Sequence, residues 1–143
     1  MQPTAYYNAV KALLIDKENN VLILRKSQNN LRHAGKSGCF NLPGGKMNTN
    51  ETISEAIRRE VFEETGLKMI SFEHKPIFKG EWKPIVYGVT HHIKGSFFVC
   101  KKWEGKIRLN DEHDDFAWIN SGNINGYNIL PPEDEAILAY YSR

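Results

Sequence analysis

Cysteine is scarce in this chain. The 143 residues contain two, Cys39 and Cys100, and they form no CxxC pair. This scarcity argues against a disulfide framework and favours a reducing compartment. A chain of this length can bury a core without such cross-links. We therefore expect both thiols to be small buried side chains.

Long hydrophobic runs and a strong excess of one charge are also missing. No apolar run approaches the roughly 20 residues that a membrane helix requires. The N-terminal segment MQPTAYYNAVKALLIDKENN has no basic stretch followed by a long apolar one, so we expect no signal peptide. The formal net charge is only +2, which does not favour a nucleic-acid or membrane partner. We therefore expect a cytoplasmic protein.

What the sequence does contain is an alternation of short apolar segments with polar turns. These segments predict strands over Val10–Ile15, Val21–Leu24, Met69–Phe78, Ile85–His92, Ser96–Lys101 and Phe116–Ile119. A polar, basic loop is expected over Ser27–Gly38, and Phe40–Pro43 leads into a turn at Gly44-Gly45. A closing helix is expected over Asp134–Tyr141, after Pro131-Pro132.

The clearest helix is predicted over Thr52–Thr65. Thr52 is the N-cap candidate, Glu55 completes a capping box, and Gly66 is a natural stop. One apolar face is formed by Ile53, Ala56, Ile57 and Val61. Strands on both sides of this helix, with a second helix last, predict a single α+β domain over residues 1–143.

Three carboxylates recur on this helix at positions i, i+3 and i+4. Glu60, Glu63 and Glu64 should share one face, away from Ile53 and Ile57. Converging carboxylates form an oxygen-rich site of the kind that Mg²⁺ and Mn²⁺ prefer. The alternative is a solvated acidic face paired with Arg58 and Arg59.

The spacing around these glutamates resembles the signature of the Nudix hydrolase family. It consists of Gly45, five residues, Glu51, seven residues, Arg59-Glu60-Val61, one residue, Glu63-Glu64, one residue and Gly66-Leu67. The resemblance implies an α/β/α sandwich with a mixed sheet. It also implies that Glu60, Glu63, Glu64 and the Gly44 carbonyl bind Mg²⁺ or Mn²⁺, and that Glu51 and Arg59 form a structural pair. A Gly-Gly turn would let the backbone approach a ligand closely.

The same resemblance implies a reaction. Family members hydrolyse a nucleoside diphosphate linked to another group, through attack of water on a pyrophosphate phosphorus. Glu60 is a candidate for ligand or general base, and the sequence does not separate the two roles. Glu112 could supply a base or an extra ligand, or it could be a solvated loop acid beside Asp111, Asp114 and Asp115.

Three features bear on the substrate. The segment LPPEDEAI resembles the PP-x-N-E segment of the MutT-type nucleoside triphosphate pyrophosphatases, with Asp134 at the base-reading position. Alternatively, Asp134 belongs to the acidic first turn of a Pro-started helix. Nearby basic residues could hold phosphates or be solvated: Arg25, Lys26, Arg32 and Lys36. Aromatic residues that could stack on a base or pack in the core are Phe40, Trp82, Tyr87 and Trp118.

Other substrates and one other class of protein stay open. ADP-ribose, nucleotide sugars, dinucleoside polyphosphates and coenzyme A are all hydrolysed within the family. RKSQNNLRHAGKSGCFNLPGG echoes the coenzyme A motif at a different spacing, and Pro84 and Tyr87 give no clean match to the downstream motifs. A nucleotide-sensing Nudix domain without hydrolysis is the alternative class, although the intact signature favours an enzyme. The sequence allows either a monomer or a homodimer.

Overall fold

The computed structural model of the chain describes residues 3–27 and 38–143. Most of the predicted basic loop, including Arg32 and Lys36, therefore lies outside the described residues, as do residues 28–37 of the segment compared with the coenzyme A motif.

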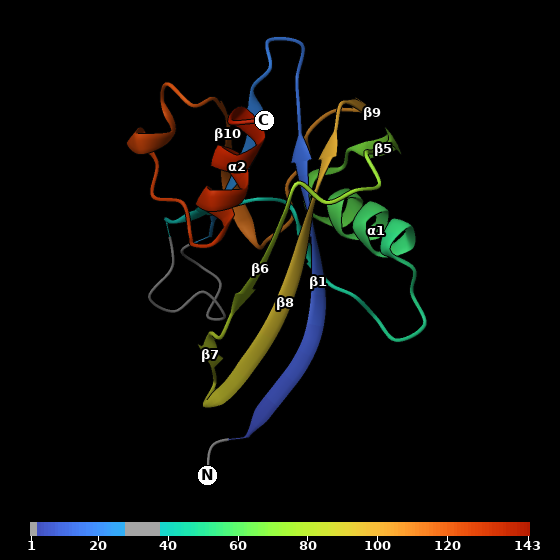
Figure 1. Cartoon of the computed structure of the whole chain (residues 1–143), viewed down its shortest axis with the longest axis vertical. Helices are drawn as coiled ribbons and strands as arrows, with labels where there is room; N and C mark the ends of the chain where they lie inside the picture. The colour runs from blue at the N-terminus through green and yellow to red at the C-terminus, as the bar shows by residue number, and fades with distance from the viewer. Residues whose placement is uncertain (1–2, 28–37) are drawn as a thin grey trace.

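The described elements alternate strands with two α-helices (Figure 1). The strands are β1 (Thr4–Leu14), β2 (Val21–Lys26), β3 (Phe40–Asn41), β4 (Gly44–Lys46), β5 (Lys68–Ser71), β6 (Phe78–Trp82), β7 (Ile85–Val86), β8 (Val89–Cys100), β9 (Lys102–Glu104) and β10 (His113–Ile119). The helices are α1 (Ile53–Thr65) and α2 (Glu133–Tyr141), with a 3₁₀ turn over Ile124–Gly126.

The main sheet is built on the parallel pairing of β1 with β8. The register runs from Thr4 opposite Thr90 to Leu14 opposite Cys100, and Figure 1 shows the two strands side by side through the centre of the molecule. Antiparallel β4 and β6 flank this pair, so the sheet is mixed, as predicted. A second sheet has the order β10-β2-β3, and β5 pairs with β9.

Alternating side chains of β1 divide the core into two layers. Val10, Ala12 and Leu14 face the apolar cluster that contains α1. Leu13, and Ile15 directly after the strand, face the cluster that contains α2. Because successive strand residues point to opposite faces, one strand serves both layers. The predicted α/β/α sandwich is confirmed.

Helix α1 begins and ends where its capping residues predict. The Thr52 hydroxyl accepts a hydrogen bond from the Glu55 N–H at 3.1 Å, and the Glu55 carboxylate accepts one from the Thr52 N–H at 3.0 Å. Gly66 adopts the left-handed conformation with φ of 75° and donates its N–H to the Phe62 carbonyl. That conformation favours glycine.

Several predicted strands are wrong in extent. β1 begins at Thr4 rather than Val10, and β10 begins at His113 rather than Phe116. Met69–Phe78 is not one strand, because β5 ends at Ser71 and β6 begins at Phe78. Pro76 lies between them and cannot donate to a strand ladder. The predicted Ile85–His92 strand is broken at Tyr87 and Gly88, whose φ values of 50° and 76° make the turn from β7 into β8. β8 then continues without a break through Gly95 to Cys100.

Smaller differences concern the glycine pair and the helix surfaces. Gly44 and Gly45 do not form the turn but begin β4, and the chain bends just before them at Leu42-Pro43. On α1, Ile53 is 43% exposed although the other apolar residues of its predicted face are buried.

Cys100 is buried as expected, whereas Cys39 is partly exposed; both thiols are free.

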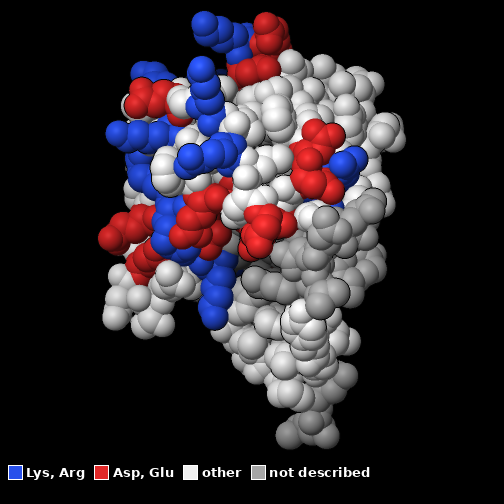
Figure 2. Space-filling view, turned by 180° about the vertical axis from the view of Figure 1, so that it is seen from behind, with Lys and Arg blue, Asp and Glu red and all other residues white. Residues whose placement is uncertain are grey.

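The described helices are also too short or too polar to cross a membrane. On the face seen in Figure 2, acidic and basic side chains lie interspersed.

The capping box predicts a measurable loss of stability. Thr52→Ala should lower the free energy of unfolding by about 1 kcal/mol, because the Glu55 N–H loses its acceptor. Urea denaturation measures this loss. Thr49→Ala, three residues earlier at an exposed position, is the matched control, and an equal loss in both variants would contradict the capping role.

Candidate active site

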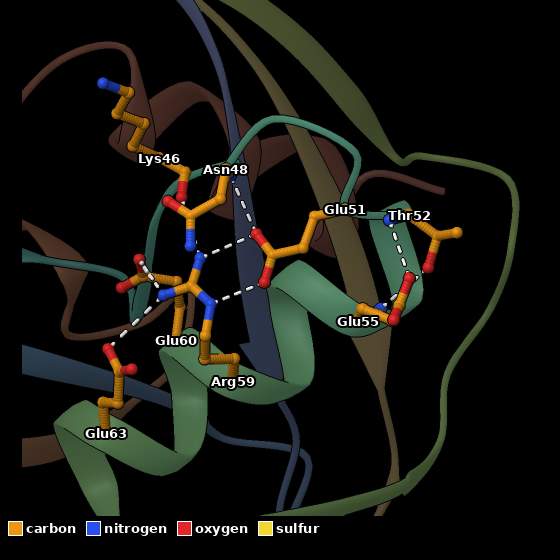
Figure 3. Close-up of polar contacts among 8 residues, drawn as sticks. All are labelled: Lys46, Asn48, Glu51, Thr52, Glu55, Arg59, Glu60 and Glu63. Atoms are coloured by element: carbon orange, nitrogen blue, oxygen red, sulfur yellow. Dashed lines mark hydrogen bonds and ion pairs between the residues drawn. The ribbon is translucent and has the colours of Figure 1, made fainter.

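The Arg59 guanidinium lies at the centre of a polar network on α1 (Figure 3). Its Nε and Nη2 atoms donate to the two oxygens of Glu51 at 2.6 and 2.9 Å. Nη2 also donates to the Lys46 carbonyl at 3.1 Å, and Nη1 donates to Glu60 at 2.9 Å. A longer contact of 3.5 Å reaches Glu63. Arg59 therefore joins the segment before α1 to the carboxylates of the helix.

The Glu51 carboxylate is strongly held in its charged form. The hydrogen bonds from Arg59, followed by the bond from the Asn48 N–H at 2.8 Å, lower the pKa of Glu51 to about 2. Hydrogen bonds to a carboxylate favour its ionised state. The structure thus brings together Glu51 and Arg59, which the signature pairs.

The three glutamates of α1 lie in three different environments. Glu64 is buried, accepts the Gly44 N–H at 3.1 Å, and burial raises its pKa to about 8 although Lys11 and the Gly44 bond oppose the shift. Burial also raises the pKa of Glu60, against the hydrogen bond from Arg59. Glu63 keeps 53% of its side chain exposed. The three carboxylates therefore differ in hydration, because Glu64 packs against β4 while Glu63 faces solvent.

Strand β4 approaches these carboxylates through its glycines. A Cβ atom built on Gly45 would lie 2.7 Å from Glu60 Oε2, closer than non-bonded atoms allow. Gly45 therefore lets the β4 backbone pack directly against Glu60. The preceding residue, Gly44, brings its own peptide group beside Glu64.

A distant loop brings Glu112 to the same place. The Asn110 side chain donates to the Glu63 carbonyl and accepts from the Glu112 N–H, both at 3.0 Å. The charge of Glu112 contributes to the raised pKa values of both Glu60 and Glu64. The structure therefore groups Glu112 with the helix carboxylates. Asn110 was missed by the sequence analysis; its only signal is the preference of Asn for bonding the backbone two residues on.

The donor chemistry of this group fits a hard divalent cation. Its members are carboxylate oxygens, and Glu60 and Glu64 carry pKa values raised by burial, so a cation would stabilise their charged forms. Within residues 3–27 and 38–143, no three His, Cys, Asp or Glu side chains already converge enough to hold a metal ion. Instead, Arg59 contacts Glu60 and Glu63, whereas Arg58 turns to Ser54 and the Met69 carbonyl.

The predicted substrate-binding residues make separate contacts. Arg25 donates to Asp114 at 2.7 Å. The Phe40 ring packs edge-on against Tyr127, with the ring centroids 5.2 Å apart. Asp134 is half-buried in the first turn of α2 and accepts the Glu135 N–H at 2.9 Å.

The aromatic candidates divide between core and surface. Trp82 packs on Phe97, and Trp118 stacks on Trp103. Tyr87 is 75% exposed at the tip of the β7–β8 turn.

The sequence analysis also missed a buried ion pair beside the carboxylates. Lys11 of β1 lies 3.5 Å from Glu133 of α2, and both side chains are buried. A lysine inside the apolar segment VKALLI and an acid directly after Pro131-Pro132 are the signals that could have indicated it.

Comparisons with known proteins find similarity over nearly the whole chain. The NUDIX domain profile matches residues 5–140. The crystal structure of the MutT protein from Methanosarcina mazei Go1 superposes with a TM-score of 0.80 and 25% identity, covering 97% of this chain and 95% of that one. The 8-oxo-dGTP diphosphatase of Buchnera aphidicola is 27% identical over 132 residues, which are 92% of this chain and 91% of that protein. The ADP-ribose pyrophosphatase of Methanocaldococcus jannaschii is 43% identical over 54 residues, only 38% of this chain and 29% of that protein.

The Glu51 carboxylate predicts a pH dependence of stability. Its folded pKa of about 2 lies below the ordinary value of 4.5, so its contribution is full above pH 4.5 and is lost as the pH falls toward 2. The difference in unfolding free energy between wild type and Glu51→Gln should therefore shrink over this interval. Urea denaturation at a series of pH values measures it.

Glu18→Gln, at an exposed position of the β1–β2 turn, is the control for that series. A Glu51→Gln difference that stays constant between pH 4.5 and 2 would show that Arg59 does not stabilise the charged carboxylate.

Proposed function

The chain belongs to the Nudix family of hydrolases, and we propose that it converts a nucleoside triphosphate into a monophosphate and pyrophosphate with Mg²⁺ or Mn²⁺. The observation that carries this proposal is the packing of two helix carboxylates on β4, with Glu64 bonded to the Gly44 N–H and Glu60 against Gly45. The profile match over residues 5–140 supports treating the chain as one such domain.

Two observations favour a triphosphate among the substrates of the family. The similarity to the 8-oxo-dGTP diphosphatase extends over nearly the full length of both proteins, whereas the similarity to the ADP-ribose pyrophosphatase is confined to 54 residues. The LPPED segment also joins the site, because Glu133 bonds the residue two before Gly44. Asp134, the proposed base-reading residue, follows Glu133 directly.

The proposed reaction is attack of water on a phosphate of the substrate. A bond forms between the water oxygen and phosphorus, the bridging bond between the α and β phosphates breaks, and a proton of the water is released. Glu60, Glu63, Glu64 and the Gly44 carbonyl would hold the cation, which when bound neutralises phosphate charge and lowers the pKa of water. Glu60, whose position Arg59 fixes, would instead take the proton if the cation is held by the other ligands alone. Glu112 is the second candidate for this role.

The function is tested with Glu64→Gln. Its amide oxygen can still accept the Gly44 N–H, so the fold should persist. Turnover should fall at least about a hundredfold, because a charged ligand contributes several kcal/mol to the transition state. Mg²⁺ should raise the melting temperature of the wild type and should do so much less in the variant.

The assay is a panel of nucleoside triphosphates, ADP-ribose, dinucleoside polyphosphates and coenzyme A, with and without Mg²⁺. Glu104→Gln, an exposed acid on β9, is the control. Preferred hydrolysis of ADP-ribose would replace the triphosphate proposal with the activity named for the Methanocaldococcus jannaschii relative. Nucleotide binding without any hydrolysis would identify a sensor.

Asp134 supplies a test of base recognition. If its carboxylate faces the base, Asp134→Ala should reduce the ratio of kcat/KM between preferred and other bases by about tenfold. The variant loses one hydrogen bond that distinguishes the bases. The measurement is kcat/KM for several nucleoside triphosphates. Glu135→Ala, at the next and more exposed position, is the matched control. An unchanged base preference in Asp134→Ala would mean that Asp134 only serves the first turn of α2.

A further inference from the structure

A buried ion pair outside the Nudix signature contacts the segment that carries Gly44. Lys11 and Glu133 are 6% and 5% exposed, and their charged atoms lie 3.5 Å apart. Such a pair is often no more stabilising than apolar side chains of the same volume, because both charges lose their hydration. Stability alone therefore gives little reason for it, and its other contacts are informative.

Both members of the pair bond the same backbone residue. The Glu133 carboxylate accepts the Leu42 N–H at 2.7 Å, and the Lys11 ammonium donates to the Leu42 carbonyl at 3.0 Å. Leu42 lies between β3 and β4 and is fully buried, so no strand ladder supplies these partners. Two side chains from β1 and α2 thus satisfy both polar groups of one peptide residue.

The bonded residue leads directly into the site. Two residues after Leu42, the Gly44 N–H donates to Glu64. Gly44 also rests on Lys11, since a Cβ atom built on it would lie 2.7 Å from Lys11 Cα and 2.9 Å from Lys11 Cδ. Pro43, which lies between Leu42 and Gly44, accepts the Ala12 N–H at its carbonyl at 2.9 Å. A movement of Leu42 would therefore displace the Gly44 peptide relative to Glu64.

The same contact fixes the other half of the proposed site. Glu133 is the first residue of α2 and immediately precedes Asp134. Upstream, the Leu130 N–H donates to the Phe40 carbonyl at 3.0 Å, and Phe40 bridges to Ile129. The segment before α2 and the segment before β4 are thus joined at Phe40 and at Leu42, with Glu133 as the buried side-chain link.

We propose that Glu133 and Lys11 are positioning residues that hold Leu42, and through it the Gly44 peptide, in the place where metal and substrate require it. The inference rests on the proposed function, in which the Gly44 carbonyl is a metal ligand. Neither residue touches the substrate; each acts through the backbone of Leu42.

The test compares Glu133→Gln with Glu133→Leu. Both substitutions remove the charge opposite Lys11, but only the glutamine keeps an oxygen that can accept the Leu42 N–H. Glu133→Gln should stay within about threefold of wild-type kcat/KM, whereas Glu133→Leu should lose about tenfold or more, because small displacements of catalytic groups are costly. Mn²⁺ affinity, measured by electron paramagnetic resonance without substrate, should follow the same order.

The outcomes separate this inference from the proposed function. Equal Mn²⁺ affinity and equal kcat/KM in the two folded variants would overturn the positioning role, since a purely electrostatic contribution affects both alike. A wild type that hydrolyses no nucleotide would overturn the proposed function, while the Mn²⁺ comparison would still decide the positioning role.

A folding defect has its own control. If Glu133→Leu does not fold, Glu133→Gln and Glu133→Leu are compared again in a Lys11→Met background. That background removes the buried ammonium that would otherwise be left without a counter-charge. If Glu133→Leu is unfolded in that background as well, the proposal is overturned. The hydrogen bond between Glu133 and Leu42 would then support the whole fold rather than the Leu42–Gly44 segment.

Discussion

Strand β1 constrains every other part of this molecule. It pairs with β8 along its full length and with β4 on its other edge. Its residues alternate between the α1 layer and the α2 layer, so Val10 and Ala12 support α1 while Lys11 and Leu13 face α2. A shift by one residue would exchange the two sets. The position of β4, and therefore of Gly44 beside Glu64, depends on this register.

The electrostatics of the site follow from how deeply each carboxylate is packed. Glu64 packs toward the sheet and loses its hydration, Glu60 packs against Gly45 of β4 and keeps 15% of its side chain exposed, and Glu63 stays in contact with solvent. Arg59 compensates the two outer glutamates and also holds Glu51. One guanidinium thus limits repulsion among like charges and ties the segment before α1 to the helix, a geometry that a lysine could not reproduce.

The proposed activity uses two regions that are far apart in sequence. The cation site lies between β4 and α1, and the proposed base-reading segment begins α2. Glu133 and Lys11 connect the two regions through Leu42. Asn110 makes a comparable link between the end of α1 and Glu112. In both cases a side chain satisfies backbone groups that no regular element supplies, which fits segments that must be held in irregular conformations.

Local rules were sufficient to predict some features from the sequence alone. The limits of α1 followed from Thr52, Glu55 and Gly66, because capping depends on neighbours within a few residues. The signature spacing identified the family for a similar reason, since it is contained in one continuous segment from β4 to the end of α1. The closing helix was predicted to begin one residue too late, at Asp134, because its start is not marked by a side-chain cap.

Only the tertiary structure decided the features that depend on contacts across the chain. Helical spacing placed Glu60, Glu63 and Glu64 on one face, but it could not show that the sheet buries Glu64 and leaves Glu63 exposed. The strand predicted over Met69–Phe78 is divided because its two ends pair with different strands, β5 with β9 and β6 with β8, and Pro76 was the local signal of the break. Glu133 was passed over beside Asp134 because its partners, Lys11 and Leu42, are about ninety or more residues away in sequence. Burial and pairing are properties of the whole fold, and the charges of this site acquire their chemistry from them.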